Sequence, residues 1–477
     1  MKGLKKIFSQ IDLTSGSPYK VLLFFTIPLL IYQLLSSSFS LVNSIVLKNT
    51  VGGDSVAAIN ATSSISLLLF QFAFGCSSGF TIMISEVFGK KDLDKLKKVF
   101  HNAIYLCILL GIFITIIGSL CYKELLMFLK IDARYFDKAS SYYQILLIGF
   151  VFVLLSNYLA NVLRAIGDSF APLVISFITT IINIILAFLL TGVLRLDTRG
   201  VAIATIIANI VSVIISYLYI NKKYSYLKHN GAMESVEWSL CGNMMKVGLP
   251  LGFQWSILFF GSFFQSRTVN AFGDGLATKA ASCYSSFESY MVILYSSISA
   301  SLLNYVGQNY GKRDLYRIRK GIKGTLFVNT IIWLVLFIGV FLCADYVPYI
   351  FLPEKEVNDP INGPIIIYYC STYLKTISAL FFLQGYLTVF RSVLQGIQKT
   401  FIPFVSGVAE LVARIAVCAL LPSIINPSNP ISNESFVGVC FATPAAWFLS
   451  FMIMGIGVFY YMFHKKEILF NLNSSEN

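Results

Sequence analysis

Residues 89–98 read GKKDLDKLKK, and residues 311–320 read GKRDLYRIRK. The first stretch lies in the N-terminal half and the second in the C-terminal half of a chain that is apolar almost everywhere between and around them. A charged motif that occurs twice in an apolar chain indicates an internal duplication. A duplication determines the architecture of the whole chain, so it is considered before local patterns.

The duplication extends beyond this motif. Three further pairs of segments occur in the same order in both parts of the chain, at nearly constant separation. They are FTIPLL at 25–30 with VGLPLG at 247–252, GGDSVAA at 52–58 with FGDGLAT at 272–278, and RAIGDSFAP at 164–172 with QGIQKTFIP at 395–403.

Four ordered pairs predict two homologous halves. We expect an N-terminal six-helix lobe over 1–221, a cytoplasmic linker over 222–244, a C-terminal six-helix lobe over 245–463 and a cytoplasmic tail over 464–477.

The composition excludes an ordinary soluble domain. Hydrophobic residues make up 56% of the 477 residues and charged residues only 12%, against roughly 25% charged residues in soluble domains. The net charge of +13 is typical of membrane proteins whose cytoplasmic loops collect Lys and Arg. We therefore expect no nucleic-acid partner.

Twelve apolar segments are long enough to span a bilayer as helices. The sequence thus predicts an all-α polytopic membrane protein with 12 transmembrane helices in two six-helix lobes. The segments are 20–47, 55–87, 99–122, 139–164, 170–194, 199–221, 245–268, 276–308, 322–345, 362–391, 401–422 and 436–463.

The distribution of Lys and Arg orients these spans. Most lie at the termini and in the loops on the same side, which predicts a multi-pass protein of the cytoplasmic membrane with both termini in the cytoplasm. Both copies of the basic motif then lie in cytoplasmic loops, where they contact membrane lipids of negative charge. We expect Gly89 and Gly311 to end the preceding helices.

Because each half has an even number of spans, both halves have the same orientation. Parallel repeats of this kind occur in secondary transporters, where substrate lies between the halves. Pro28 and Pro250, early in the first helix of each half, are hinge candidates, although a static kink accounts for them equally well. A duplicated scaffold protein is the alternative.

These motifs together resemble those of the MATE (multidrug and toxic compound extrusion) transporters, and of their DinF-type bacterial branch in particular. The resemblance covers about 18–463. Its carriers, besides Pro28 and the two basic motifs, are LRAIGDSFAP at 163–172, INIIL at 182–186, RGVAIATIIAN at 199–209 and GLPLGFQWSI at 248–257.

The resemblance implies two six-helix lobes and extrusion of amphipathic, often cationic compounds by antiport with H⁺ or Na⁺. The family's acids in the N-terminal lobe are missing: Asn43 stands at one acid position, and Ala187 stands at the other, four residues after the retained Asn183. Thr205 matches a polar site of the family. The span-7 acid of a second family variant is also missing, and Gln254 is the nearest polar residue.

Four charged residues of the second half stand out because they lie deep inside predicted spans, where an ionisable group is costly. Glu410 and Arg414 share one helix face and can pair, and Glu288 and Lys375 could complete a neutral four-charge cluster. A proton or Na⁺ that competes for a carboxylate would couple transport to the gradient. A network that only fixes helix packing is the alternative.

We expect no enzyme activity, no cofactor and no metal site, and we expect a monomer. Aromatic side chains are candidates to line the transport cavity: Tyr32, Phe72, Phe74, Trp255, Phe264, Tyr284 and Tyr290. Two alternatives to drug export stay open. One is a flippase for lipid-linked oligosaccharide or saccharide substrates from the same superfold, and the other is a transport-inactive sensor or scaffold.

Overall fold

The computed structural model describes residues 10–50, 53–128, 133–228, 235–272 and 275–464. Every regular element within these ranges is a helix. The predicted all-α fold class is therefore confirmed. The residues divide into two compact units, of which the first comprises 1–255 with 307–312 and the second comprises 256–306 with 313–477.

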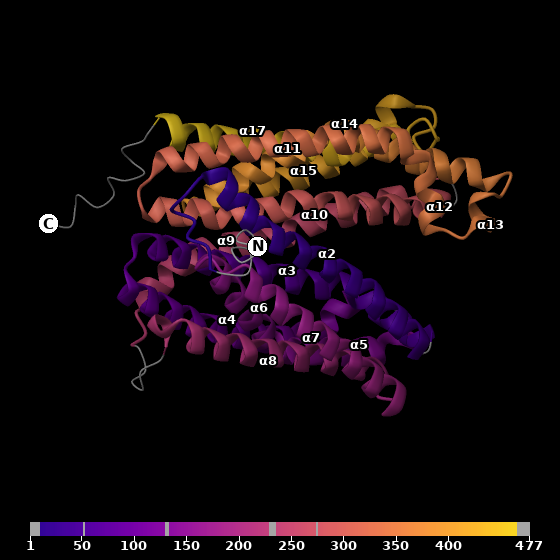
Figure 1. Cartoon of the computed structure of the whole chain (residues 1–477). Coiled ribbons are helices and arrows are strands. Elements are labelled where there is room, and N and C mark those ends of the chain that lie inside the picture. Colours follow the sequence, from indigo (N-terminus) through magenta and orange to yellow (C-terminus); the bar gives the residue numbers. More distant parts are fainter. Residues whose placement is uncertain (1–9, 51–52, 129–132, 229–234, 273–274, 465–477) are drawn as a thin grey trace, which may run out of the picture. The chain divides into compact units, whose positions relative to one another are not determined.

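The described part of the first unit is built from seven long helices and the beginning of an eighth (Figure 1). Its core lies where α3 and α4 pack on α6, and the Tyr158 hydroxyl donates to the Phe100 carbonyl there (2.9 Å). The helices are α2 (Pro18–Thr50), α3 (Gly53–Lys90), α4 (Leu93–Phe128), α5 (Ala133–Ile148), α6 (Phe150–Ala165), α7 (Phe170–Phe188), α8 (Asp197–Lys223) and the first part of α9 (Trp238–Val269).

In the second unit, Figure 1 shows the long helices running alongside one another. The tightest packing joins α15 to α17 and α14 to both α11 and α17. The helices are α10 (Leu276–Gly311), α11 (Leu315–Cys343), α14 (Asn362–Gly396), α15 (Phe401–Ile425) and α17 (Ala442–Phe459), with short helical turns α12 (Val347–Phe351), α13 (Glu354–Val357) and α16 (Phe436–Cys440) between them.

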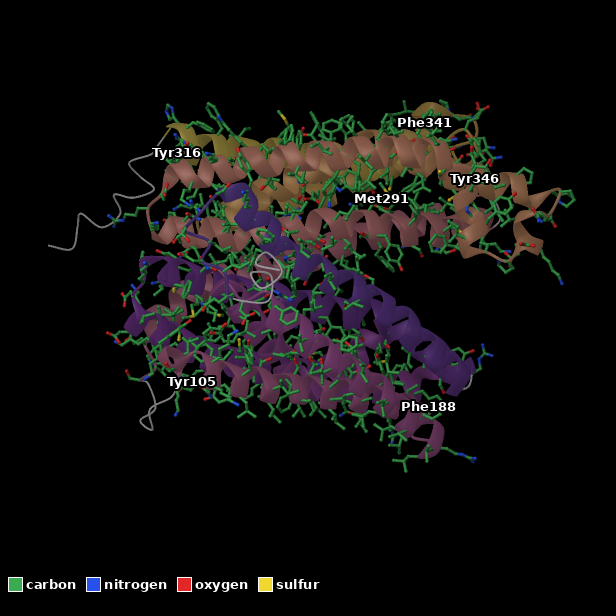
Figure 2. The ribbon with its side chains drawn as sticks, viewed as in Figure 1. Tyr105, Phe188, Met291, Tyr316, Phe341 and Tyr346 are labelled. Atoms are coloured by element: carbon green, nitrogen blue, oxygen red, sulfur yellow. The ribbon has the colours of Figure 1, made fainter. Side chains whose placement is uncertain are left out.

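The predicted spans correspond to these helices. Among the described residues, 10 helices are long and apolar enough to cross a membrane, and the α5–α6 pair, bent by 49° at Gly149, makes an eleventh span. The remaining predicted span is α10, whose 36 residues are sufficient in length but include many serines. Large apolar side chains on the outer faces, such as Phe188 and Phe341, point away from the bundles, as Figure 2 shows.

The two basic motifs adopt the same local structure. Lys91 (φ 61°) and Arg313 (φ 59°), which occupy equivalent positions in the two motifs, both take the left-handed conformation that ends one helix. Asp92 and Asp314 then cap the next helix, because their Oδ1 atoms accept from the Lys95 and Arg317 N–H groups (3.0 and 2.9 Å). The duplication read from the sequence is thus present in the backbone.

The expected helix ends are close to those observed: α10 ends at Gly311, and α3 ends at Lys90, one residue after Gly89. The left-handed residues that follow the two helices are Lys91 and Arg313 and not the glycines. Gly89 and Gly311 allow close backbone approach within the first unit. A Cβ on Gly89 would collide with the Gln308 carbonyl, and one on Gly311 would collide with the Glu86 carbonyl. The ends of α3 and α10 therefore cross at reciprocal glycines.

The N-terminal segment joins this crossing. The Ile11 N–H donates to the Gly167 carbonyl (2.9 Å), and the Leu13 N–H donates to Gln308 Oε1 (3.2 Å). Gln308 Nε2 in turn donates to the Ala165 carbonyl (2.8 Å). The end of α10 is thus hydrogen-bonded to the last residue of α6 as well as packed on α3.

Replacing Gly311 with Ala tests the crossing. The added methyl has to displace the backbone of α3, so we expect the free energy of unfolding to fall by about 1–3 kcal/mol. Thermal unfolding of the detergent-purified protein measures the loss. Gly339→Ala is the matched control, because a Cβ there meets nothing within 4 Å. Equal stability of the two variants would contradict the reciprocal contact.

Candidate functional site

A cavity of about 430 Å³ lies inside the first unit, among α2, α3, α5, α6, α7 and α8. Seventeen residues line it, and most carry an amide or a hydroxyl group. They are Tyr32, Phe70, Tyr142, Ser156, Asn157, Ala160, Pro172, Ile175, Ser176, Thr179, Thr180, Asn183, Thr205, Ala208, Asn209, Ser212 and Ser216.

Two residues predicted from the sequence, Asn183 and Thr205, line this cavity together. The Thr205 hydroxyl donates a hydrogen bond to the Val201 carbonyl of its own helix (3.0 Å). The Asn183 amide has no hydrogen-bond partner within the described part of the chain. Its donor and acceptor are therefore available to a bound molecule.

The lining carries no carboxylate and no cationic group among the residues that the structure describes. Ala187, where the family has an acid, is buried one turn beyond Asn183 and accepts a hydrogen bond from Thr191 (2.6 Å) with its carbonyl. Asn43 lies on α2, but its side chain is outside the described residues. Of the seven aromatic candidates, Tyr32 lines the cavity.

Arg164 is a residue beside the cavity that the sequence reasoning missed. It is buried near the end of α6, its Nη1 donates to Asn161 Oδ1 (2.8 Å), and its guanidinium carbon lies 4.8 Å from the centre of the Tyr32 ring. No carboxylate pairs with it among the described residues. Its place before the GDSFAP turn suggested a helix end, and no pattern indicated burial.

Asp168, in the turn between α6 and α7, gathers four hydrogen bonds. Its Oδ2 accepts from Tyr219 (3.0 Å), Lys223 (2.9 Å) and Tyr224 (2.6 Å), and its Oδ1 accepts from the Ala171 N–H (3.0 Å). Burial alone would raise its pKa, but these hydrogen bonds and the charge of Lys223 outweigh burial and lower the pKa. The cluster ties α8 to the start of α7.

In the second unit, Glu410 pairs with a residue that was not predicted. Its Oε1 accepts from Arg391 Nη2 (2.8 Å), and both side chains are more than nine-tenths buried. The expected partner, Arg414, instead donates to Ser262 Oγ (3.0 Å). The sequence pattern missed this pair because Arg391 lies on α14, at the edge of a predicted span.

The predicted four-charge cluster is therefore replaced by separate contacts. Glu288 Oε2 accepts from the Tyr373 hydroxyl (3.0 Å) and interacts electrostatically with Arg414, although no direct ion pair joins them among the described residues. Lys375 does not reach this region: its Nζ pairs with Asp345 (3.0 Å), and one third of its side chain is exposed.

Glu288, Tyr373 and Arg414 come from α10, α14 and α15 and form the site that we call the Glu288 site. The Tyr373 ring stacks on Tyr284 at 3.7 Å, which fixes the hydroxyl that faces the carboxylate. No cluster of His, Cys, Asp and Glu suited to a metal occurs in the described ranges.

The remaining candidates lie on α2 and α9. Gln254 is fully buried in the part of α9 that belongs to the first unit. Pro28 and Pro250 lie inside helices that continue on both sides of them. Their role as hinges stays a prediction.

Comparison with known sequences agrees with this architecture. The sequence model of the MatE family matches residues 28–189 and 250–420, two ranges that begin at Pro28 and Pro250. The chain is 25% identical to "Probable multidrug resistance protein YoeA" of Bacillus subtilis (strain 168) over 71% of this chain and 75% of that protein. It is 23% identical to a protein named FAD transporter of Shewanella oneidensis, over 92% and 93%.

Solved structures share the fold. A crystal structure of MATE in complex with MaL6 superposes with a TM-score of 0.83 at 18% identity, over 94% of this chain and 98% of that one. A MOP superfamily transporter from Pyrococcus furiosus, whose binding pocket is described as having reverse polarity, gives a TM-score of 0.82 at 18% identity, over 95% and 98%.

The Asp168 cluster predicts a pH-dependent contribution to stability. Because the pKa of Asp168 is lowered on folding, its contribution is present above the unfolded pKa of about 3.9 and is lost as pH falls through the folded pKa. We expect Asp168→Asn to destabilise the protein by about 2 kcal/mol at pH 7, with the difference shrinking below about pH 4. Thermal unfolding from pH 7 to 3 measures this, with exposed Asp94→Asn as the control. A pH-independent difference would contradict the assignment.

The buried ion pair predicts a non-additive double mutant. Glu410→Leu leaves the Arg391 guanidinium buried without a counter-charge, so we expect a loss of about 3–5 kcal/mol. Adding Arg391→Leu removes the buried charge that lacks a partner, so the double variant should regain most of the lost free energy of unfolding. Thermal unfolding of both single variants and the double variant measures the coupling. Additive effects would mean that the two side chains do not stabilise each other.

Proposed function

The chain belongs to the MatE family, and from this premise we propose that it is a secondary active exporter of amphipathic small molecules across a cytoplasmic membrane. The observation that carries the proposal is the cavity of about 430 Å³ that residues of six helices of the first unit line. Small-molecule sites generally measure about 300–1,000 Å³, and the volume of this cavity lies within that range. Tyr32, Phe70 and Tyr142 supply rings for the apolar part of a substrate, and Asn183 supplies hydrogen bonds.

The proposed orientation places both termini and both basic motifs in the cytoplasm, because Lys and Arg concentrate on that side. Alternating access between the two halves then exports the bound molecule. A relative named FAD transporter supports a cargo class that is wider than cationic drugs. The protein is proposed to act as a monomer.

Coupling is assigned to Glu288. Its carboxylate is held by a neutral donor, Tyr373, and attracted by Arg414 without a direct ion pair among the described residues. A cation that binds the carboxylate releases Arg414 from this attraction, and loss of the cation restores it. Glu410 is a poorer candidate, because a cation there has to break the buried pair with Arg391.

The coupling ion that this arrangement favours is H⁺. A proton occupies one carboxylate oxygen and needs no shell of ligands, whereas Na⁺ needs several oxygen atoms around it. The guanidinium of Arg414 also repels a second positive charge nearby. Protonated Glu288 keeps its contact with the Tyr373 hydroxyl, which can either donate or accept a hydrogen bond.

Dye efflux from cells that express the protein tests this function. Rhodamine 6G and fluorescein are compared, with the proton gradient intact or collapsed by a protonophore, and with or without Na⁺. We expect proton-dependent efflux of at least one dye, and Glu288→Gln should reduce it at least tenfold while the protein stays in the membrane. The exposed Glu434→Gln on the same unit is the control.

Each outcome decides between alternatives. Efflux that needs Na⁺ and not H⁺ overturns the choice of ion, and unchanged efflux in Glu288→Gln overturns the coupling residue. No gradient-dependent transport of either dye favours the inactive sensor or the flippase.

A further inference from the structure

The cavity of the first unit has a positive charge beside it and no negative charge to balance it among the residues that the structure describes. Arg164 is about nine-tenths buried, and its Nε has no hydrogen-bond partner in this part of the chain. Its recorded contacts are Asn161 Oδ1 and the face of the Tyr32 ring. A buried guanidinium generally needs an anion and several acceptors to offset the loss of hydration.

The acid nearest in sequence cannot serve as this anion. Asp168 lies four residues after Arg164, but its Oδ2 accepts from Tyr219, Lys223 and Tyr224, and its charge is offset by Lys223. Arg164 therefore contributes an uncompensated positive charge to the described part of the first unit.

Arg164 borders the cavity by its position. Asn157 and Ala160 line the cavity from α6, and Arg164 follows at positions i+7 and i+4 on the same helix face. Tyr32 also lines the cavity, and the guanidinium carbon of Arg164 lies 4.8 Å from the centre of the Tyr32 ring. The side chain thus lies one helical turn beyond the lining residues of α6.

The lining itself is neutral but can recognise an anion. Hydroxyl and amide groups donate hydrogen bonds to carboxylate or phosphate oxygens, and the Asn183 amide is available for this. An arginine can bind such a group through two parallel N–H donors. A cationic compound would meet no carboxylate among the described lining residues and would be repelled by Arg164.

We propose that this cavity binds amphipathic organic anions, with Arg164 as the counter-charge of a carboxylate, sulfonate or phosphate group and Asn183 as a hydrogen-bond partner. The inference rests on the proposed function for the export step and narrows its substrate class. The binding step itself needs no gradient and is tested separately.

Two dyes that share a tricyclic xanthene core but differ in charge show whether the charge of a ligand or its shape determines binding. Fluorescein is an anion near neutral pH and rhodamine 6G is a cation, and fluorescence polarisation with the full-length protein in neutral detergent measures both affinities. We expect tighter binding of fluorescein. Arg164→Gln should weaken fluorescein binding at least about tenfold, or about 1.4 kcal/mol, and leave rhodamine 6G binding unchanged or stronger.

The controls distinguish recognition from structure. Arg164→Lys keeps the charge and should retain most of the fluorescein affinity even if the Gln variant folds poorly. Arg199→Gln removes an exposed arginine from the same unit and should change neither affinity. Asn183→Leu should weaken fluorescein binding without reversing the preference between the dyes.

A lipid headgroup and a soluble molecule both offer the same anionic chemistry. If the natural ligand is an anionic lipid, short-chain phosphatidylglycerol added to the micelles should displace fluorescein from the cavity. Phosphatidylcholine, which has no net charge, should not displace it. If phosphatidylglycerol leaves fluorescein binding unchanged, the natural ligand is a soluble anion.

The proposal would be overturned if the wild-type protein bound rhodamine 6G more tightly than fluorescein. An equal loss of affinity for both dyes in Arg164→Gln would overturn it too. Failure of gradient-driven efflux alone would overturn the export function and leave the binding site standing.

Discussion

A charge taken out of water inside a membrane protein has to be neutralised by the protein or by what it binds. By this constraint, the buried ionisable residues divide into those that the protein neutralises and those that it leaves without a direct partner of opposite charge. Glu410 and Arg391 neutralise each other in the second unit, and Lys223 neutralises Asp168 in the first. Glu288, Arg414 and Arg164 remain without a direct ion pair among the described residues. The two proposed sites are the places where the internal balance of charge is incomplete.

The duplication supplies the frame that holds these residues. Its basic motif combines three local devices that recur in the second half: a glycine at a close helix crossing, a left-handed residue and an aspartate cap. The second half departs from the first where chemistry is assigned. When RAIGDSFAP is aligned with QGIQKTFIP, Arg164 and Asp168 correspond to Gln395 and Lys399. The repeat therefore preserves architecture while the ionisable side chains diverge.

Hydrophobic length and repetition made the helical fold class and the order of spans predictable, since each is a property of contiguous residues. Asn183 and Thr205 were found from a resemblance, and the cavity contains both. Ion pairs were not predictable, because i,i+4 spacing within α15 suggested Arg414 while the real partner of Glu410 comes from α14. Arg164 was missed for a similar reason: burial of a helix end depends on neighbouring helices that the local pattern does not specify.

The proposed division of labour, with cargo in the first unit and coupling in the second, requires helices that belong to both. Two helices meet this requirement. α10 carries Glu288 in the second unit, while its end at Gly311 packs against Glu86 in the first. α9 carries Ser262, the partner of Arg414, while its earlier residue Leu251 packs against Gly75. In the proposed mechanism, protonation of Glu288 weakens its attraction to Arg414, which is the partner of Ser262 on α9. Other residues of α9 and α10 pack on α3, which lines the cavity through Phe70. The proposed coupling therefore assigns the link between cation and cargo to helices α9 and α10, and it needs no carboxylate among the described lining residues of the cavity.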